Sequence, residues 1–114
     1  MKMLDANFIL RFLLNDNAEI SNIARDIIKN YPVKVASEVI AEVIYVMKSV
    51  YKIEKTDMCN SLIKFMSIGN IISDDKKVII KSIQLYNENN LDFVDCLLCA
   101  YHIEYGYDIC TFDK

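Results

Sequence analysis

The chain has 114 residues, of which 54% are hydrophobic and 25% charged, with only 2 Gly and 1 Pro. This composition predicts one folded domain with a real core, excludes a disordered chain and argues against a turn-rich β-sandwich. The net charge of −3 excludes nucleic-acid binding by positive charge alone. No apolar run reaches the roughly 18 residues of a membrane span, and no secretory signal is recognisable. We therefore expect a cytoplasmic protein without a membrane segment.

Hydrophobic periodicity predicts alternating strands and helices in the first half of the chain. Asn-Asp-Asn at 15–17 and Tyr31-Pro32 interrupt the helical pattern, and Ser37 is a natural N-cap for the clearest amphipathic helix. In chain order we expect a strand over 2–5, helices over 7–14 and 18–29, a strand over 33–36 and a helix over 38–51.

In the second half, three further helices and a last strand are expected. Thr56 caps a helix that ends near Gly69, Asp74 opens the next, and Gly106 stops the third. The helices cover 56 to about 69, 76–87 and 91–105, and the strand covers 108–112. The helix over 91–105 is apolar on nearly all sides, which predicts that it is sandwiched between other layers.

Strands separated by helices predict an α/β fold in which a short parallel sheet is flanked by helices. The carboxyl ends of such strands share one edge of the sheet, where these folds bind ligands. Asp5 closes the first expected strand, and Asp113 closes the last. Asp5 is equally well interpreted as a loop acid that caps the helix over 7–14.

Most acidic residues lie at helix starts or on polar faces, but Asp92 and Asp95 lie one turn apart in a strongly apolar helix. A carboxylate carried into the interior must be paired, protonated or bound to a cation, and no Lys or Arg lies close by in the sequence. The alternative is that Asp92 is an N-cap and Asp95 an ordinary acid of the first turn. Glu42 borders the apolar arc of its helix, and by itself it is interpreted as a solvated side chain.

Four of these acids could converge on one edge of the sheet: Asp5, Glu42, Asp95 and Asp113. Two charges about 5 Å apart repel by roughly 3 kcal/mol at an effective dielectric of 20, so such a cluster would either take up protons or bind a divalent cation. Oxygen ligands select Mg²⁺ or Mn²⁺, which can activate water for phosphodiester cleavage. A bound cation would also let an acidic protein engage RNA.

Four segments of the chain resemble PIN-domain nucleases, and in particular the VapC-type toxins of toxin–antitoxin pairs. They are Leu-Asp-Ala-Asn-Phe-Ile-Leu-Arg-Phe-Leu-Leu-Asn-Asp at 4–16, Ser-Glu-Val-Ile-Ala-Glu-Val-Ile-Tyr-Val at 37–46, Leu-Asp-Phe-Val-Asp-Cys-Leu-Leu at 91–98 and Thr-Phe-Asp-Lys at 111–114. The segments follow the family's order from one end of the chain to the other.

The resemblance implies a single three-layer PIN-like domain over 1–114 that acts as an Mg²⁺- or Mn²⁺-dependent endoribonuclease. Asp5, Asp95 and Asp113 would hold the metal, Glu42 would complete the catalytic acids, and Asp92 would lie nearby. Asn7 would fix Asp5, and the Thr111 hydroxyl would face the same edge as Asp113. The implied partners are transfer or ribosomal RNA as substrate, a cognate antitoxin that blocks the site, and a second copy in a homodimer.

Two departures from the family pattern affect the site. Position 6 is Ala where many members carry Thr or Ser, so a supporting hydroxyl is missing. Relatives usually continue past the position of Lys114, so the resemblance implies a domain that is short at this end. Its last strand could be missing, and Asp113 would then be less firmly held.

Other readings of the sequence stay open. A non-catalytic PIN-like binding module would share the fold, although such modules tend to lose site acids and none is lost here. Cys96 and Cys99, with His102 three residues on, could form a redox or zinc site, against the reading of small buried hydrophobes and a half-exposed histidine. Arg11 could contact RNA phosphate, against the reading of a solvated side chain.

Overall fold

Three parallel strands form the sheet in the computed structural model, which describes residues 1–112. The strands are β1 (Lys2–Met3), β2 (Val33–Lys34) and β3 (Ile71–Ile72), in the spatial order β1-β2-β3. The ladder continues past the strands, because Leu4 N donates to Lys34 O at 3.0 Å and Val35 N donates to Ile72 O at 2.8 Å. The carboxyl ends of the strands therefore share one edge, as expected for crossover connections.

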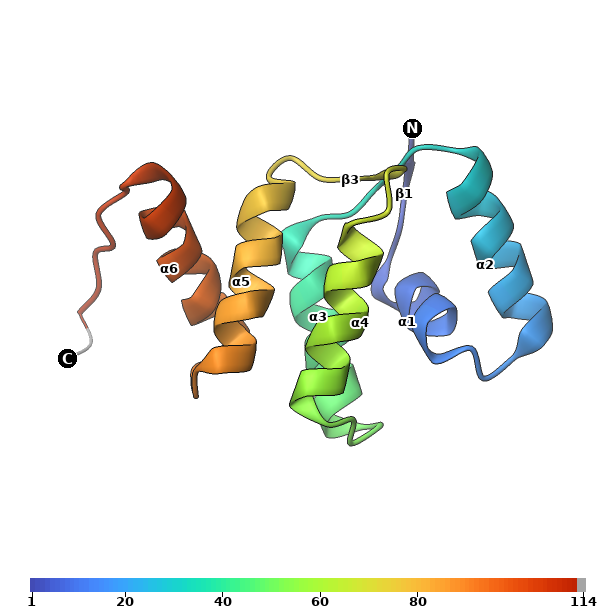
Figure 1. The fold of residues 1–114 in the computed structure, drawn as a ribbon, viewed down its shortest axis with the longest axis horizontal. Coiled ribbons are helices and arrows are strands. Elements are labelled where there is room, and N and C mark those ends of the chain that lie inside the picture. Colours follow the sequence, from blue (N-terminus) through green and yellow to red (C-terminus); the bar gives the residue numbers. More distant parts are fainter. Residues whose placement is uncertain (113–114) are drawn as a thin grey trace.

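Six helices flank this sheet in the described part of the chain, and all six were predicted from periodicity. They are α1 (Ala6–Leu14), α2 (Ala18–Asn30), α3 (Ser37–Ser49), α4 (Lys55–Met66), α5 (Lys76–Glu88) and α6 (Phe93–Tyr105). Figure 1 shows α1 and α2 at one end of the molecule, α6 at the other, and α3, α4 and α5 between them. The predicted class, an α/β fold with a short parallel sheet flanked by helices, is confirmed. None of the helices within residues 1–112 is long and apolar enough to cross a membrane.

The helix ends follow local chemistry, with three corrections. The N-cap of α5 is Asp75, whose side chain accepts a hydrogen bond from Val78 N at 3.3 Å, and not Asp74. Gly106 adopts the left-handed conformation (φ 72°) and ends α6 as predicted. Ser37 is not an N-cap: α3 starts at Ser37, Ala36 takes the cap position, and the Ser37 hydroxyl lies 3.0 Å from Glu38 Oε1. Thr56 is not a cap either, because the preceding Glu54 side chain accepts a hydrogen bond from Thr56 N at 2.9 Å.

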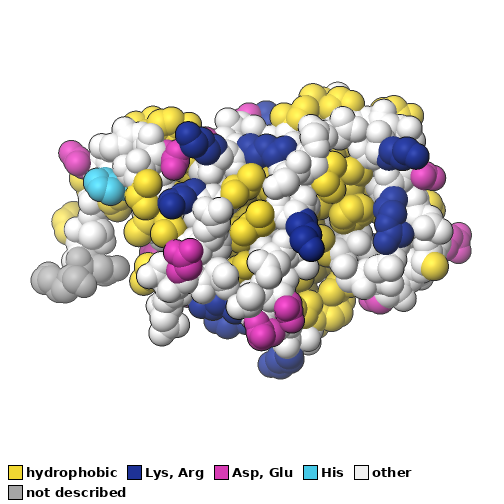
Figure 2. Space-filling model, viewed as in Figure 1, with side chains coloured by type: hydrophobic (Ala, Val, Ile, Leu, Met, Phe, Trp, Pro, Cys, Tyr) yellow, Lys and Arg dark blue, Asp and Glu magenta, His cyan; other side chains and the backbone are white. Residues whose placement is uncertain are grey.

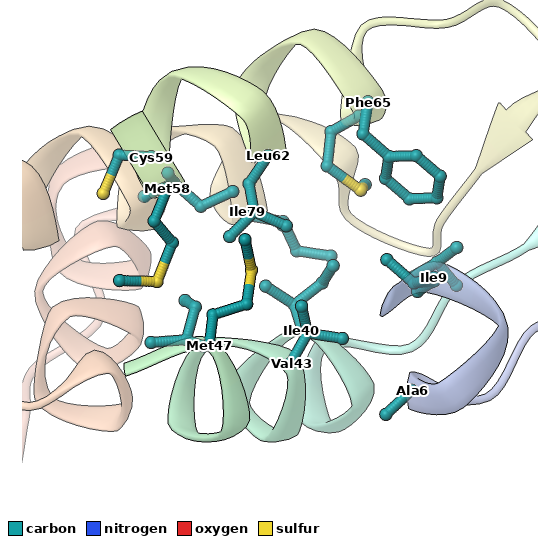
Figure 3. Close-up of a cluster of buried hydrophobic side chains, with 14 of the residues drawn as sticks. Ala6, Ile9, Ile40, Val43, Met47, Met58, Cys59, Leu62, Phe65 and Ile79 are labelled. Carbon is teal, nitrogen blue, oxygen red and sulfur yellow. The ribbon is translucent and has the colours of Figure 1, made fainter. Parts of the chain in front are cut away.

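Most of the core shown in Figure 3 lies between α3 and α4, and side chains of α1 close one side of it. Helix α3 contributes a stripe at helical spacing, α4 packs against it, and α5 packs against α4. Each fully buried aliphatic or aromatic side chain contributes about 1.5–3 kcal/mol by leaving water. The largest fully buried side chains are Phe65, Ile9, Ile40, Met58, Leu62, Met66, Ile71, Ile79, Ile83, Val33, Val35 and Val43.

The third strand lies elsewhere in the chain than predicted. Residues 108–112 form no strand within the described part, and the third strand is instead β3, Ile71–Ile72. An alternating pattern becomes a strand only where an edge strand accepts its backbone hydrogen bonds. Residues 108–112 follow α6 at the end of the molecule away from β1, and Ile109 and Phe112 are exposed (Figure 1).

The prediction that α6 is sandwiched is also wrong. Only Phe93, Cys96 and Ala100 of α6 are buried, while Val94 and Leu98 on its other side are 57% and 42% exposed. The reason is the position of α6 at the end of the molecule, where it packs on α5 and α3 and no described helix covers its outer face (Figure 1). Asp95 is consequently a surface carboxylate and not an interior one.

Candidate active site

Asp5 stands where the first strand turns into the first helix. It is the N-cap of α1, and its Oδ1 atom accepts a hydrogen bond from Phe8 N at 2.9 Å. The Asp5 side chain is exposed, and its carboxylate makes no ion pair with any described Lys or Arg. The cap therefore fixes the carboxylate at the carboxyl edge of the sheet while one oxygen stays open to a ligand.

Asn7 does not provide the hydrogen bond that fixes Asp5, because that bond comes from the Phe8 backbone. Asn7 is exposed on α1 and shares a shallow cavity of about 250 Å³ with Asp5 and Arg11. The role expected for Asn7 stays a prediction.

Helix α3 connects the positions of the other acids. It packs against α1, which Asp5 caps, and against α6, which carries Asp95. Glu42 is exposed on α3 and makes no hydrogen bond or ion pair with the described residues. The helix with Glu42 is thus placed between the helix that starts at Asp5 and the helix that starts beside Asp92.

Asp92 and Asp95 lie together at the start of α6. Asp92 is the N-cap of α6, as one reading of the sequence proposed, but its side chain makes no capping hydrogen bond. Asp95 is exposed in the first turn, where the free N–H groups of the helix favour negative charge. Both line a cavity of about 380 Å³ between α3 and α6, with Tyr45 and Lys48 on the α3 side.

Thr111 approaches Asp95 from the other direction. The segment after Gly106 returns along α6, and a cavity of about 730 Å³ separates the two. Asp95 and Thr111 both line this cavity, although 15 residues of sequence separate them. Asp113 lies outside the described residues, so its role stays a prediction.

The candidate acids Asp5, Glu42 and Asp95 offer only carboxylate oxygens. Such ligands fit a hard divalent cation. Within residues 1–112, no group of three or more His, Cys, Asp or Glu side chains is close enough to hold a metal ion. The described acids therefore have the ligand chemistry that such a cation prefers, but their side chains do not gather into a metal site within residues 1–112.

A further cavity, of about 300 Å³, lies at the carboxyl ends of β2 and β3 and was not predicted from the sequence. Lys34 and Asp74 form an ion pair on its wall. Glu38 also lines it, and a hydrogen bond from its own backbone N–H, followed by one from Ser37, lowers the pKa of the Glu38 carboxyl. These acids therefore have partners, in contrast to Glu42 and Asp95.

Arg11 is engaged within the chain. Its guanidinium lies 3.1 Å from Asp16 Oδ2 across the end of α1. The other Lys and Arg side chains are interspersed with acidic ones on the face shown in Figure 2, without a single positive patch. RNA contact by Arg11 stays a prediction, and it would compete with Asp16.

The cysteines do not form the redox or zinc site considered above. Cys96 is buried whereas Cys99 is exposed, and burial raises the pKa of the Cys96 thiol, which opposes nucleophilic activation. The reading as a small buried hydrophobe is confirmed for Cys96 and wrong for Cys99. His102 is exposed, and its Nδ1 atom lies 2.8 Å from Tyr107 O at the end of α6.

Comparison with known proteins identifies the family. The model of the PIN domain matches residues 2–114, which is nearly the whole chain, and the protein belongs to this family. Members are generally nucleases and typically depend on divalent metal ions. Comparisons with curated proteins and with solved structures give no match.

Proposed function

We propose that the protein is an endoribonuclease that uses Mg²⁺ or Mn²⁺ to hydrolyse phosphodiester bonds of structured RNA. The observation that carries the proposal is the packing of α3 against both α1 and α6, within a chain of the PIN family. This packing places the helix of Glu42 between the helix that Asp5 caps and the helix that carries Asp95, and all three carboxylates are exposed.

Each acid has a role in the proposed reaction. Asp5 and Asp95, together with Asp113, would hold the cation, and Glu42 would orient the attacking water or accept its proton. When bound, the cation would supply a Lewis acid that lowers the pKa of water and neutralises the scissile phosphate. Asp92, Asn7 and Thr111 would support this site from its margins.

The biological setting in the proposal is a toxin–antitoxin pair, with transfer or ribosomal RNA as substrate. A cognate antitoxin would silence the enzyme, which would act in the cytoplasm as a homodimer. Exposed apolar side chains that support a protein partner include Val94, Leu98 and Ile103 on α6.

A cleavage assay tests the proposal. Purified protein is incubated with total transfer RNA and ribosomal RNA in Mg²⁺ or Mn²⁺, and then with chelator in excess. We expect discrete cleavage products that chelator abolishes and that Asp95→Asn removes. RNA binding without cleavage under all metal conditions would instead indicate a non-catalytic PIN-like binding module.

A further inference from the structure

We propose that Tyr45 and Lys48 position the RNA substrate: the Tyr45 ring stacks on one unpaired base, and the Lys48 ammonium pairs with a neighbouring phosphate. This inference rests on the proposed nuclease function and adds a nucleotide-binding wall to its site. Neither residue is among the metal-binding or catalytic residues proposed above.

The cavity between α3 and α6 places both side chains opposite candidate acids. Tyr45 and Lys48 line one wall, and Asp92 and Asp95 line the other. Its volume of about 380 Å³ lies within the range of about 300–1,000 Å³ that is typical of small-molecule pockets. A nucleotide held here would have its phosphate beside Asp95, where the proposed reaction takes place.

The cavity also offers an aromatic and apolar floor. Tyr86 and Phe93 line it, with ring centroids 6.2 Å apart in an edge-to-face arrangement. Phe93 is buried, so these rings are rigidly packed. A flat base can enter such a site from the solvent side and lose water on both of its faces.

Tyr45 is the exposed ring at the mouth of this cavity. Its side chain is 68% exposed, and its ring makes no contact with another described aromatic ring or cation. Tyr101, Tyr105 and Tyr107, in contrast, stack on one another. Tyr45 thus presents a free π-face, which is what base stacking requires.

Lys48 is the cation of the same wall. It is exposed and makes no ion pair with the described residues, whereas Lys34 and Lys77 are paired with Asp74 and Glu104. Glu42, Tyr45 and Lys48 follow one another at intervals of three residues, so each is a neighbour of the next on the surface of α3. A protein with net charge −3 needs such a local cation to hold RNA next to its acids.

Binding measurements separate the two contacts. Fluorescence anisotropy with labelled oligouridylate is recorded in an Asp5→Asn background, which prevents cleavage. Stacking predicts that Tyr45→Leu weakens binding about 5- to 100-fold and that Tyr45→Phe, which keeps the ring, binds like the parent. The phosphate contact predicts that Lys48→Gln lowers the slope of log affinity against log salt by about 0.7.

Matched controls and an abasic probe make the result decisive. Tyr51→Leu and Lys64→Gln remove another exposed tyrosine and lysine that line no part of this cavity, and they should leave binding unchanged. On an abasic ribose-phosphate oligomer, the effect of Tyr45→Leu should vanish and that of Lys48→Gln should persist. Circular dichroism melts confirm that each variant is folded.

The outcomes distinguish this inference from the nuclease proposal. The stacking contact is overturned if folded Tyr45→Leu binds like the parent, or if it loses as much affinity on the abasic oligomer as on oligouridylate. This holds even if the wild type cleaves RNA. If RNA binding depends on Tyr45 but the wild-type protein never cleaves RNA, the nuclease proposal is refuted. The RNA contacts proposed for Tyr45 and Lys48 remain supported.

Discussion

The carboxylate of Asp5 accepts a hydrogen bond from the backbone N–H of Phe8 at 2.9 Å, so one candidate catalytic residue also caps a helix. The cap needs only a side-chain oxygen, whereas a metal ligand of this kind needs the negative charge. Asparagine can meet the first need but not the second, and alanine meets neither. The two roles of Asp5 can therefore be separated by substitution.

We expect Asp5→Asn to keep the free energy of unfolding within about 0.5 kcal/mol of the wild type, because asparagine caps helices as well as aspartate does. Asp5→Ala should lower it by about 1 kcal/mol. Both variants should lose metal-dependent RNA cleavage. Urea unfolding and a cleavage assay measure the two effects, and normal cleavage by Asp5→Asn would remove Asp5 from the site.

The proposed role of Asp95 predicts a change in metal binding. Mg²⁺ that binds only the folded state raises its stability by about 2.7 kcal/mol at a concentration one hundred times its Kd. In Asp95→Asn this shift should be much smaller, while stability without metal changes by about 0.5 kcal/mol, since Asp95 is an exposed acid of a first helical turn.

Asp57→Asn is the matched control for Asp95→Asn, because Asp57 is likewise an exposed acid in the first turn of its helix, α4. Thermal melts with Mg²⁺ and with chelator compare the three proteins. We expect Asp57→Asn to keep the full metal-induced rise in melting temperature. An equal rise in the Asp95→Asn protein would contradict a metal site at Asp95.

Elements that depend on local periodicity were predictable, and those that depend on distant partners were not. All six helices follow from apolar spacing and from breakers such as Gly106, because a helix satisfies its backbone within one segment. β3 has only two residues, and its pairing with β2 is a long-range property. The pattern at 108–112 is typical of a strand, but sequence does not reveal whether an edge strand lies within reach.

The same distinction applies to the candidate site. Asp5 and Asp95 could be selected because carboxylates stand out beside apolar segments, but the exposure of Asp95 depends on which helices cover α6. The sequence did not indicate a role for Tyr45, because a tyrosine in an amphipathic helix can equally belong to the hydrophobic core. Its position on a cavity wall follows only from where α6 packs.

Burial of Cys59 predicts a loss of stability at alkaline pH. Desolvation raises the pKa of its thiol from 9.0 to about 11, and the nearby charge of Lys55 offsets only part of this. Between these pH values the unfolded chain loses the proton and the folded chain keeps it. The free energy of unfolding should therefore fall as pH rises from 9 to 11, at up to about 1.4 kcal/mol per pH unit for this group.

Urea unfolding across this pH range compares the wild type with Cys59→Ala and Cys110→Ala. Lysines distant from Cys59 contribute equally to all three proteins, so the difference between their slopes reports the thiol together with its interaction with Lys55. Cys59→Ala should flatten the decline, although the cavity it leaves lowers stability at every pH. Cys110→Ala, which removes an exposed thiol, should keep the wild-type slope. A Cys59→Ala slope equal to that of the wild type would contradict a protonated buried thiol.

Lys76 ties the start of α5 to β3 and to the turn before it. Its Nζ atom donates to Ile68 O at 3.0 Å and to Ile71 O at 2.8 Å, in a partly buried position. Lys76→Met keeps the aliphatic stem but leaves both carbonyls without this partner, which should lower the free energy of unfolding by about 1–3 kcal/mol. Lys77→Met removes only a surface ion pair with Glu104 at 3.2 Å and should cost about 0–1 kcal/mol. Urea unfolding measures both, and equal losses would show that the carbonyl contacts of Lys76 add nothing beyond a surface charge.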